Sequence, residues 1–428
     1  MTGPVERIRR SYLLASVWHD DNKGDSAIAE SVLELAAAAF PDADCTIASM
    51  LDRRHESYQT AFRHLSRRFP YHRIVPSPVA KPELGRGRVP ELLRWLATAG
   101  AASVALALRL PSDLARAVRS SSLVIANGGH TLYSAAGPAT LIRLSRVLYP
   151  YWLARRYSRP YVVFGQSLGP FEPGLGRSLI GGVLRSAELV VVREELSRTA
   201  ALELGVDEAR LRVVPDAAFL MRPQPTEAVV SAQRRAGLNG RTYAVVTVRQ
   251  AYSKQGRESV TRAYLSEMAR LIERLIDSGA VERVAIVTHC LGPVPSEDDR
   301  LPSRELKALL AREHVVLVED DLSPAELAAF YADARWVVGT RFHSVILALV
   351  AGTPTVAVSY FGPKTHGIMK MLGLERLCFD IAGFDADEVL AAITASDTAV
   401  LRLEIEAAVA GLRQALTESA SDLAAAAR

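Results

Sequence analysis

Short runs of β-branched residues alternate with longer Ala- and Leu-rich segments along this 428-residue chain. This alternation constrains the fold more than any other feature, because apolar runs of about four to eight residues between segments of helical period are typical of parallel βα units. Helices then cover both faces of each sheet. In the first half of the chain we expect strands at residues 12–17, 45–49, 72–76, 122–126, 161–165, 188–192 and 211–215.

The pattern breaks at the proline-rich segment MRPQPTE, residues 221–227, and then resumes. A chain of this length exceeds the size at which one hydrophobic core keeps growing, about 250–300 residues. We therefore expect two Rossmann-like domains with parallel sheets facing each other across a cleft, at residues 1–221 and 222–384. The second series of expected strands lies at residues 243–248, 283–289, 314–318, 335–339 and 355–359.

The C-terminal segment, residues 385–428, has a helical pattern with one apolar stripe. Its length predicts a helical tail that returns to pack on the first domain. The stripe consists of Leu401, Ile405, Val409, Leu412 and Leu416.

Charge and cysteine content exclude several classes of protein. The formal net charge of +4 is small for this length and gives no case for a nucleic-acid partner, which would need a basic stripe. Cys45, Cys290 and Cys378 fit neither a disulfide framework nor a CxxC metal site, so we expect a reducing, cytoplasmic location. The apolar run at residues 95–108 is shorter than the roughly 18–20 residues that span a bilayer, so we expect no transmembrane segment.

Residues 334–374 contain no Asp or Glu, although the chain has almost as many acidic as basic residues. Arg341 and His343 follow the expected strand at 335–339, and Lys364 follows the next strand. A helix N-terminus flanked by such side chains attracts anions. The pattern predicts an anion site free of carboxylates at this sheet edge; the alternative is a structural Arg, a core His and a solvated Lys.

The segment RFHSVILALVAGTPTVAVSYFGPK, which contains these residues, closely resembles the signature of polysaccharide pyruvyl transferases. Four further segments resemble the family's motifs in the same order along the chain. They are NKGDSAI at 22–28, FGQSLGPF at 164–171, VVREELS at 191–197 and VVPDAAFL at 213–220. The resemblance implies a glycosyltransferase-B-like pair of domains, with the acceptor on the N-terminal side and the donor on the C-terminal side.

The resemblance also implies an activity: transfer of a pyruvyl group from phosphoenolpyruvate to a sugar of a cell-surface glycan, as a ketal, with no metal or other cofactor. The donor carries about three negative charges, which Arg forks and Lys are suited to hold. His343 is expected to be the general acid, because the bound phosphate and carboxylate would raise its pKa. Arg341 and Lys364 would hold the donor and stabilise the departing phosphate.

Other matching positions imply further substrate contacts. Arg193 would reach the donor phosphate, or would instead pair with Glu194 or Glu195. Asn22 and Gly24 would line the site, and Asp25 would accept a proton from a sugar hydroxyl or only cap a helix that starts at Ser26.

A glycine-rich turn, ANGGHTLYS at 126–134, would point the backbone amides of Gly128 and Gly129 at substrate. His130 stands where the family pattern suggests another glycine, which is either an extra contact or a harmless turn variant. Arg249 ends an expected strand and is a further candidate for substrate binding. His289 and Cys290 are adjacent, but without a second ligand pair they predict no metal site.

Residues 141–160 interleave five arginines with four aromatic residues, a composition that suits a membrane interface where a lipid-linked glycan acceptor would sit. A solvated helix face or a dimer contact explains the segment as well. Two rival functions remain open. One is a glycosyltransferase that uses a nucleotide sugar, and the other is a non-catalytic glycan-binding protein with the same fold.

Overall fold

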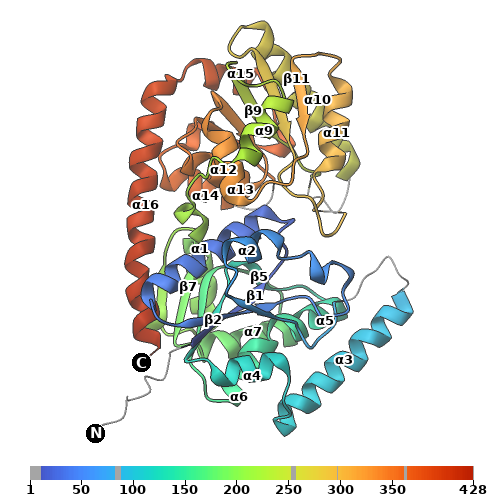
Figure 1. Cartoon of the computed structure of the whole chain (residues 1–428), viewed down its shortest axis with the longest axis vertical. Coiled ribbons are helices and arrows are strands. Elements are labelled where there is room, and N and C mark those ends of the chain that lie inside the picture. Colours follow the sequence, from blue (N-terminus) through green and yellow to red (C-terminus); the bar gives the residue numbers. More distant parts are fainter. Residues whose placement is uncertain (1–10, 82–87, 252–256, 296, 361–363, 428) are drawn as a thin grey trace. The chain divides into compact units, whose positions relative to one another are not determined.

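The computed structural model describes residues 11–81, 88–251, 257–295, 297–360 and 364–427. The chain forms two compact units, each built around one parallel sheet (Figure 1). The first unit contains residues up to Asp20, Ile28–Ala217 and Ala415–Arg428, and the second contains Asp21–Ala27 and Ala218–Gln414. The division at 217/218 lies beside the proline-rich segment that the sequence indicated. The short segment 21–27 was expected in the first domain, but it clusters with the second.

The first unit holds an eight-stranded sheet in the order β3-β2-β1-β4-β6-β7-β8, with β5 paired to β6. All of its strand pairs are parallel. The strand order reverses between β1 and β4, and ligands of such sheets bind at the carboxyl ends of the strands beside that point. The strands are β1 (Ser11–Val17), β2 (Asp44–Ser49), β3 (Arg73–Val75), β4 (Leu123–Ala126), β5 (Gly129–Ser134), β6 (Tyr161–Phe171), β7 (Leu189–Val192) and β8 (Leu211–Val213).

Helices lie between most of these strands along the chain. They are α1 (Lys23–Ala39), α2 (Arg63–Arg68), α3 (Arg88–Leu108), α4 (Asp113–Ser120), α5 (Pro138–Val147), α6 (Tyr149–Arg156), α7 (Leu175–Arg185) and α8 (Glu195–Glu203).

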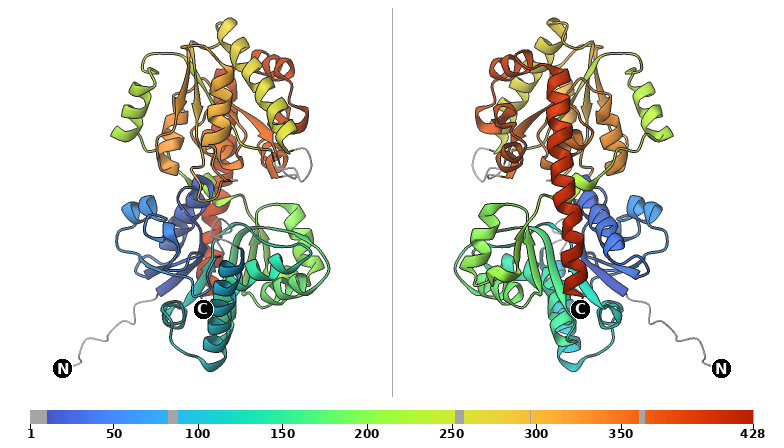
Figure 2. Two further views of the ribbon diagram at one scale, coloured as in Figure 1. Left: turned by 90° about the vertical axis from the view of Figure 1, so that its right-hand side faces the viewer. Right: turned by 90° about the vertical axis from the view of Figure 1, so that its left-hand side faces the viewer.

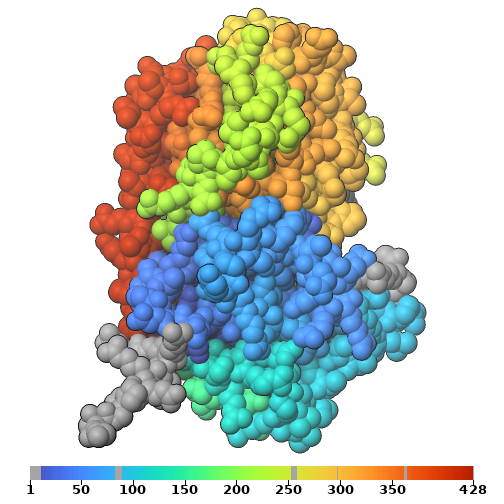
Figure 3. Space-filling view, viewed as in Figure 1, coloured from blue at the N-terminus to red at the C-terminus, as the bar shows by residue number. Residues whose placement is uncertain are grey.

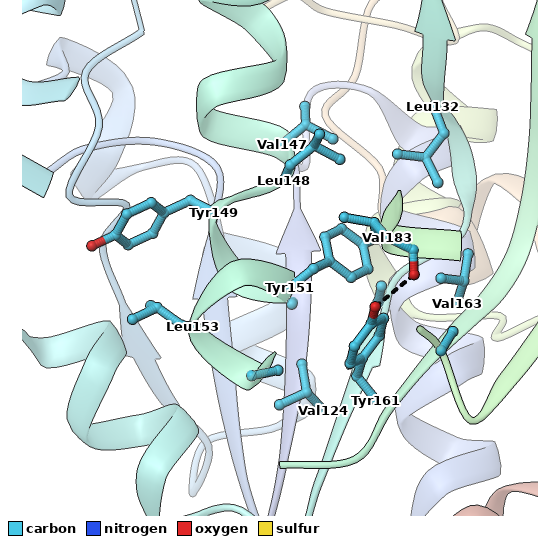
Figure 4. Close-up of a cluster of buried hydrophobic side chains, with 14 of the residues drawn as sticks. Val124, Leu132, Val147, Leu148, Tyr149, Tyr151, Leu153, Tyr161, Val163 and Val183 are labelled. Carbon is cyan, nitrogen blue, oxygen red and sulfur yellow. Dashed lines mark hydrogen bonds between the residues drawn. The ribbon is translucent and has the colours of Figure 1, made fainter. Parts of the chain in front are cut away.

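The core of the first unit packs α5, α6 and α7 against the sheet (Figure 4). Tyr161 at the start of β6 donates a hydrogen bond to the backbone carbonyl of Val183, 2.5 Å away. Tyr149 and Tyr151 are also buried, with 3 % and 0 % of their surface exposed. The segment 141–160 therefore directs two of its four aromatic rings into the core, where they cannot form the rim of a membrane surface.

The second unit holds a six-stranded parallel sheet in the order β11-β10-β9-β12-β13-β14. Its order reverses between β9 and β12, which makes the carboxyl ends of these two strands the expected ligand edge. The elements are α9 (Glu227–Arg235), β9 (Tyr243–Thr247), α10 (Arg257–Asp277), β10 (Arg283–Val287), α11 (Arg300–Leu309), β11 (Val315–Val318), α12 (Pro324–Ala332), β12 (Trp336–Gly339), α13 (Phe342–Val350), β13 (Thr355–Ser359), α14 (Lys364–Met371) and β14 (Cys378–Asp380).

The tail consists of α15 (Ala386–Thr394) and the long α16 (Thr398–Ala426), which is visible in both orientations of Figure 2. Only residues 415–428 belong to the first unit, whereas α15 and the first part of α16 belong to the second. Arg413 on α16 donates hydrogen bonds to the carbonyls of Phe219 and Met221, at 2.9 and 2.7 Å. Within the second unit, α16 is thereby tied to the segment where the chain enters that unit.

Candidate active site

At the carboxyl edge of the second sheet, Arg341 stands two residues after the end of β12, as the N-cap residue of α13. The turn from strand to helix is tight. A Cβ atom at Gly339 would lie 2.9 Å from a methyl group of Val345, so only glycine fits there without displacing the helix. Ser344 in the first turn bonds the carbonyl of Arg341 at 2.8 Å and the hydroxyl of Thr247 on β9 at the same distance. These contacts fix Arg341 beside the point where the strand order reverses.

Arg341 makes a buried ion pair with Asp299, the residue before α11. Its Nε lies 3.0 and 2.9 Å from the two carboxylate oxygens, and its Nη2 lies 2.6 Å from one of them. Nη2 also donates to the carbonyl of Glu297 at 2.8 Å. The expectation of a site without carboxylates is therefore wrong at Arg341, because a loop outside the acid-free stretch supplies one. Burial acts to lower the pKa of Arg341, but the Asp299 carboxylate outweighs it and raises that pKa.

A second guanidinium, that of Arg249 after β9, lies close to the first. Its carbon is 3.9 Å from the centre of the Tyr360 ring, and its Nε donates to the carbonyl of Gln250. Burial, and next the charge of Arg341, lower the pKa of Arg249. Two buried cations thus share the neighbourhood of Asp299, which leaves this edge of the sheet with excess positive charge.

His343, in the first turn of α13, packs against the backbone of Gly24. A Cβ atom at residue 24 would lie 2.1 Å from Nδ1 of the imidazole, so any side chain there would displace the ring. Gly24 therefore provides room for His343, which is a more specific role than the general backbone approach that the sequence indicated.

The segment that carries Gly24 is the first turn of α1, which begins at Lys23. The Asn22 side chain accepts a hydrogen bond from the amide of Asp25 at 3.3 Å, so Asn22 caps this helix. The alternative in which Asp25 caps a helix starting at Ser26 is wrong, because the helix starts three residues earlier. Asp25 remains partly exposed in the first turn.

Two residues that the sequence did not assign to the site lie in the same cluster. Lys23 is buried and pairs with Asp321 at 2.6 Å. His289, just after β10, is 1 % exposed. Its pKa lies well below the ordinary value because of burial and the nearby charges of Arg341, His343 and Lys23. The sequence did contain a signal for His289, because VTHC lies at the end of an expected strand. We used that signal only to ask whether His289 and Cys290 bind a metal.

The imidazole of His289 is held on one side. Nδ1 lies 3.2 Å from the hydroxyl of Tyr331, and Nε2 is buried with no hydrogen-bond partner among the described residues. A buried polar atom without a partner costs free energy, and such atoms often mark a ligand position. In the described part of the chain no group of three or more His, Cys, Asp or Glu residues is arranged to hold a metal ion.

Lys364 is the first residue of α14, after β13, which pairs in parallel with β12. It therefore stands at the same sheet edge as Arg341, as the sequence indicated. His366, two residues further along the acid-free stretch, instead bonds Asp380 at 2.9 Å and is half exposed.

In the first unit, three of the recognised motifs converge on Arg193. This residue follows β7, is 5 % exposed, and donates from Nε to the hydroxyl of Ser167 on β6 at 2.6 Å. Its Nη1 forms an ion pair with Asp216, after β8, and Nε lies 3.5 Å from Glu194. Arg193 thus makes the acid pairing that was weighed as the alternative, although Asp216 is the closer partner.

The two glycines after β4 have structural reasons of their own. A Cβ atom at Gly128 would lie 2.8 Å from the carbonyl oxygen of Gly165, and Gly129 has a φ of 125°. Close packing on β6 therefore accounts for Gly128. The neighbouring His130 contacts the carbonyl of Gly169 through Nε2, and its ring centre is 5.3 Å from that of Tyr133.

The family model described as "Polysaccharide pyruvyl transferase" matches residues 22–362. This match covers most of the chain and includes β9, β10, β12 and Arg341, but it ends before Lys364. The chain belongs to the polysaccharide pyruvyl transferase family.

Within the curated proteins, this pyruvyl transferase family member is similar to the amylovoran biosynthesis protein AmsJ of Erwinia amylovora. The two are 27 % identical over 243 residues, which cover 55 % of this chain and 57 % of AmsJ. The comparison therefore spans little more than half of that relative.

Solved structures with the same fold include a UDP-GlcNAc 2-epimerase from Neisseria meningitidis bound to UDP-GlcNAc. That likeness has a TM-score of 0.56 and 10 % identity, and covers 96 % of this chain and 99 % of the other. A glycosyltransferase from Rickettsia africae matches with a TM-score of 0.54 and 11 % identity, covering 97 % and 98 %. The expected fold class of two Rossmann-like, glycosyltransferase-B-like domains is confirmed.

A hollow of about 820 Å³ in the first unit lies away from these residues. Tyr161 and Leu189, which line it, begin β6 and β7. It therefore sits at the amino ends of the strands, whereas ligands of parallel sheets bind at the carboxyl ends. We therefore take the carboxyl edge of the second sheet as the candidate active site.

Proposed function

We propose that this chain transfers a pyruvyl group from phosphoenolpyruvate to a sugar of an exopolysaccharide or cell-surface glycan and releases phosphate. One observation carries the proposal. Around the carboxyl ends of β9, β10 and β12, the second unit gathers Lys23, Arg249, Arg341, His289 and His343. Family membership and the similarity to an amylovoran biosynthesis protein support a glycan acceptor.

The charge of the cluster suits a small, highly charged donor. Lys23, Arg249 and Arg341 carry three positive charges, and the carboxylates of Asp299 and Asp321 offset two of them. Lys364 at the same edge adds a further cation. Phosphoenolpyruvate brings about three negative charges on three carbons, which would otherwise be difficult to desolvate.

His343 is the residue we assign as general acid. Its imidazole would deliver a proton to the methylene carbon of the donor, which becomes the methyl group of the ketal. A sugar hydroxyl would attack the adjacent carbon, and the bond from that carbon to the phosphate oxygen would then break. A second hydroxyl of the same sugar would attack the same carbon. Of the two hydroxyl protons, one balances the proton placed on carbon and the other leaves with phosphate or to solvent.

His289 is suited to donate a hydrogen bond to an oxygen of the donor rather than to transfer a proton. Burial, then the charge of Cys290, raises the pKa of the Tyr331 hydroxyl, so Tyr331 keeps its proton. When Tyr331 donates to Nδ1, Nε2 carries the proton of the neutral imidazole and presents it to an anion. Cytoplasmic synthesis and an acceptor linked to a lipid at the inner face of the membrane belong to the same proposal.

The rival function is a glycosyltransferase that uses a nucleotide sugar. Such an enzyme needs a carboxylate for the ribose hydroxyls. Asp299 is buried against Arg341 and Asp321 is paired with Lys23, so both are engaged by cations. The similarity to the epimerase solved with UDP-GlcNAc is at 10 % identity, that to the glycosyltransferase is at 11 %, and both support the fold alone.

Phosphate release tests the proposal directly. The purified chain with phosphoenolpyruvate should release phosphate only when a suitable saccharide is present, and a mass increase of the saccharide should accompany it. Thermal stabilisation should be saturable with phosphoenolpyruvate. Stabilisation by UDP-glucose alone would support the glycosyltransferase instead. Glycan binding that is unchanged by His343→Ala, with no phosphate release from either protein, would support a non-catalytic glycan-binding protein.

A further inference from the structure

The helix α3 in the first unit has an outer face without charge. Between Val89 and Leu108 the charged residues are Glu91, which is buried, and Arg94, which is mostly buried and bonds Asp52 at 2.6 Å. The side chains that point outward are aliphatic or small. The largest exposed ones are Val89, Leu92, Leu93, Leu96, Val104 and Leu108.

This face is long and continuous. The helix has 21 residues, which corresponds to about 31 Å at roughly 1.5 Å per residue. Figures 1 and 2 show α3 at the rim of the first unit, and Figure 3 shows part of its surface at the lower right of the same view. Exposed apolar surfaces of this extent mark interaction sites rather than ordinary solvent-facing helices.

The inner face of α3 is fixed to the unit by polar contacts along its length. Trp95 donates from its indole nitrogen to Ser145 at 3.0 Å, and the Tyr149 hydroxyl donates to the carbonyl of Ala102 at 2.9 Å. Near the C-terminal end, Arg156 donates to the carbonyls of Leu106 and Ala107 at 3.2 and 3.0 Å. The helix is thus held against the unit, with its apolar side outward.

The segment Val89–Ser120 is long and apolar enough to span a membrane by length and composition alone, unlike the shorter run that the sequence analysis considered. The anchored inner face argues against spanning. Insertion across a bilayer would break the hydrogen bonds of α3 and would carry Glu91 and Arg94 into hydrocarbon, where ionised groups are costly. A helix that lies in the interface keeps those contacts and buries only its outer face.

The basic residues that follow α3 in the sequence suit an anionic lipid surface. Arg109 follows α3 directly and is exposed, and Arg116 and Arg119 on α4 are exposed as well. The acid in this stretch, Asp113, is already paired with Arg53 and Arg116. Each basic residue near an anionic membrane contributes to binding, and the effect is lost at high salt.

The composition of the face distinguishes a membrane from a second protein. Interface hot spots are rich in Trp, Tyr and Arg and poor in Leu and Val. The outer face of α3 has the opposite composition, and its single aromatic residue, Trp95, points inward to Ser145. We propose that the outer face of α3 docks this protein, in the plane of the interface, on a membrane that contains anionic lipids.

Vesicle sedimentation with the full-length chain tests this proposal without requiring turnover, so its outcome is independent of the transferase activity. The probe is a phosphatidylcholine vesicle with about 30 % phosphatidylglycerol. The double variant Leu93→Glu, Leu96→Glu places two charges on the outer face at positions that are 60 % and 50 % exposed, so the fold should be kept. We expect the wild type to sediment with vesicles and the variant to bind at least about tenfold more weakly.

Matched controls are available on other exposed leucines. Leu403→Glu on α16 and Leu309→Glu on α11 make the same chemical change at positions that are 67 % and 54 % exposed, and should leave vesicle binding unchanged. Arg109→Gln with Arg119→Gln should weaken binding only to vesicles with the anionic lipid.

Three results would overturn the proposal. They are a wild type that does not sediment with vesicles, a double variant that binds as well as the wild type, and a lipid-free dimer that the double variant converts to monomer. In the last case the face would be a contact between copies of this chain.

Discussion

His343 lies against the backbone of Gly24, so that the imidazole occupies the space where a side chain at residue 24 would be. The two residues are far apart in the sequence, and both lie in the second unit. The first turn of α1 thus fixes the position of the ring that we assign as general acid.

Gly24→Ala should therefore displace His343 without unfolding the protein. The added Cβ would lie 2.1 Å from Nδ1, so the ring must move by about 1 Å or more. A displacement of that size at a catalytic group costs about 100-fold in turnover. The measurement is phosphate release under saturating donor, with thermal unfolding to verify the fold.

Gly182→Ala is the matched control, because a Cβ at that position in α7 meets no atom within 4 Å. It should leave turnover unchanged. Its free energy of unfolding should rise by about 1 kcal/mol at most, because alanine has a higher helix propensity than glycine. Equal activity of the two alanine variants would contradict the role given to Gly24.

His343→Gln should remove the general acid while retaining a side chain of similar polarity. General acid catalysis contributes about 10²–10⁴-fold, so turnover should fall by that factor. Donor binding should change much less, because Arg341, Arg249 and Lys23 remain. The two quantities can be separated by measuring kcat together with the thermal shift that phosphoenolpyruvate produces.

The sequence predicted the sheets well because their strands are buried apolar runs between helical segments. The strand β5 was missed, since GHTLYS begins with the second of two adjacent glycines and was interpreted as part of a turn, although it pairs with the long β6. The strand β14 was missed because CFD is too short to show a period.

The candidate site was predicted in part, because strand ends leave a pattern in the sequence and irregular loops do not. Strand ends identify Arg341, Lys364 and Arg249, because all parallel strands end at one edge. The partner of Arg341 could not be predicted, since Asp299 comes from an irregular loop with no periodic signal. The packing of Gly24 on His343 depends on segment 21–27 joining the second unit, which no local pattern indicates.

Asp299→Asn should destabilise the second unit strongly. It would leave the buried guanidinium of Arg341 without its carboxylate and Arg249 with an uncompensated neighbour. Breaking a buried pair by removing one partner costs about 3–5 kcal/mol. Denaturant unfolding measures the loss.

Asp277→Asn is the control for Asp299→Asn. Asp277 pairs with Arg312 at 2.6 Å, but both side chains are exposed, at 58 % and 36 %. Such a surface pair contributes little to stability, because solvent screens the two charges. If the free energy of unfolding fell by the same small amount in both variants, the buried pair would not stabilise the second unit as we expect.

His289 should make stability depend on pH in the mildly acidic range. Its pKa in the folded protein is far below the ordinary value of about 6.5, because of burial and the nearby charges of Arg341, His343 and Lys23. Below about pH 6.5 the unfolded chain binds a proton at this imidazole that the folded protein does not bind. Stability therefore rises with pH in this window and falls as the solution becomes more acidic, by up to about 1.4 kcal/mol per pH unit.

His289→Gln should remove this contribution. Free energies of unfolding for both proteins between about pH 5 and 7.5 should diverge toward low pH, with the variant less sensitive. Parallel curves would mean that His289 takes up its proton in the folded state as readily as in the unfolded chain.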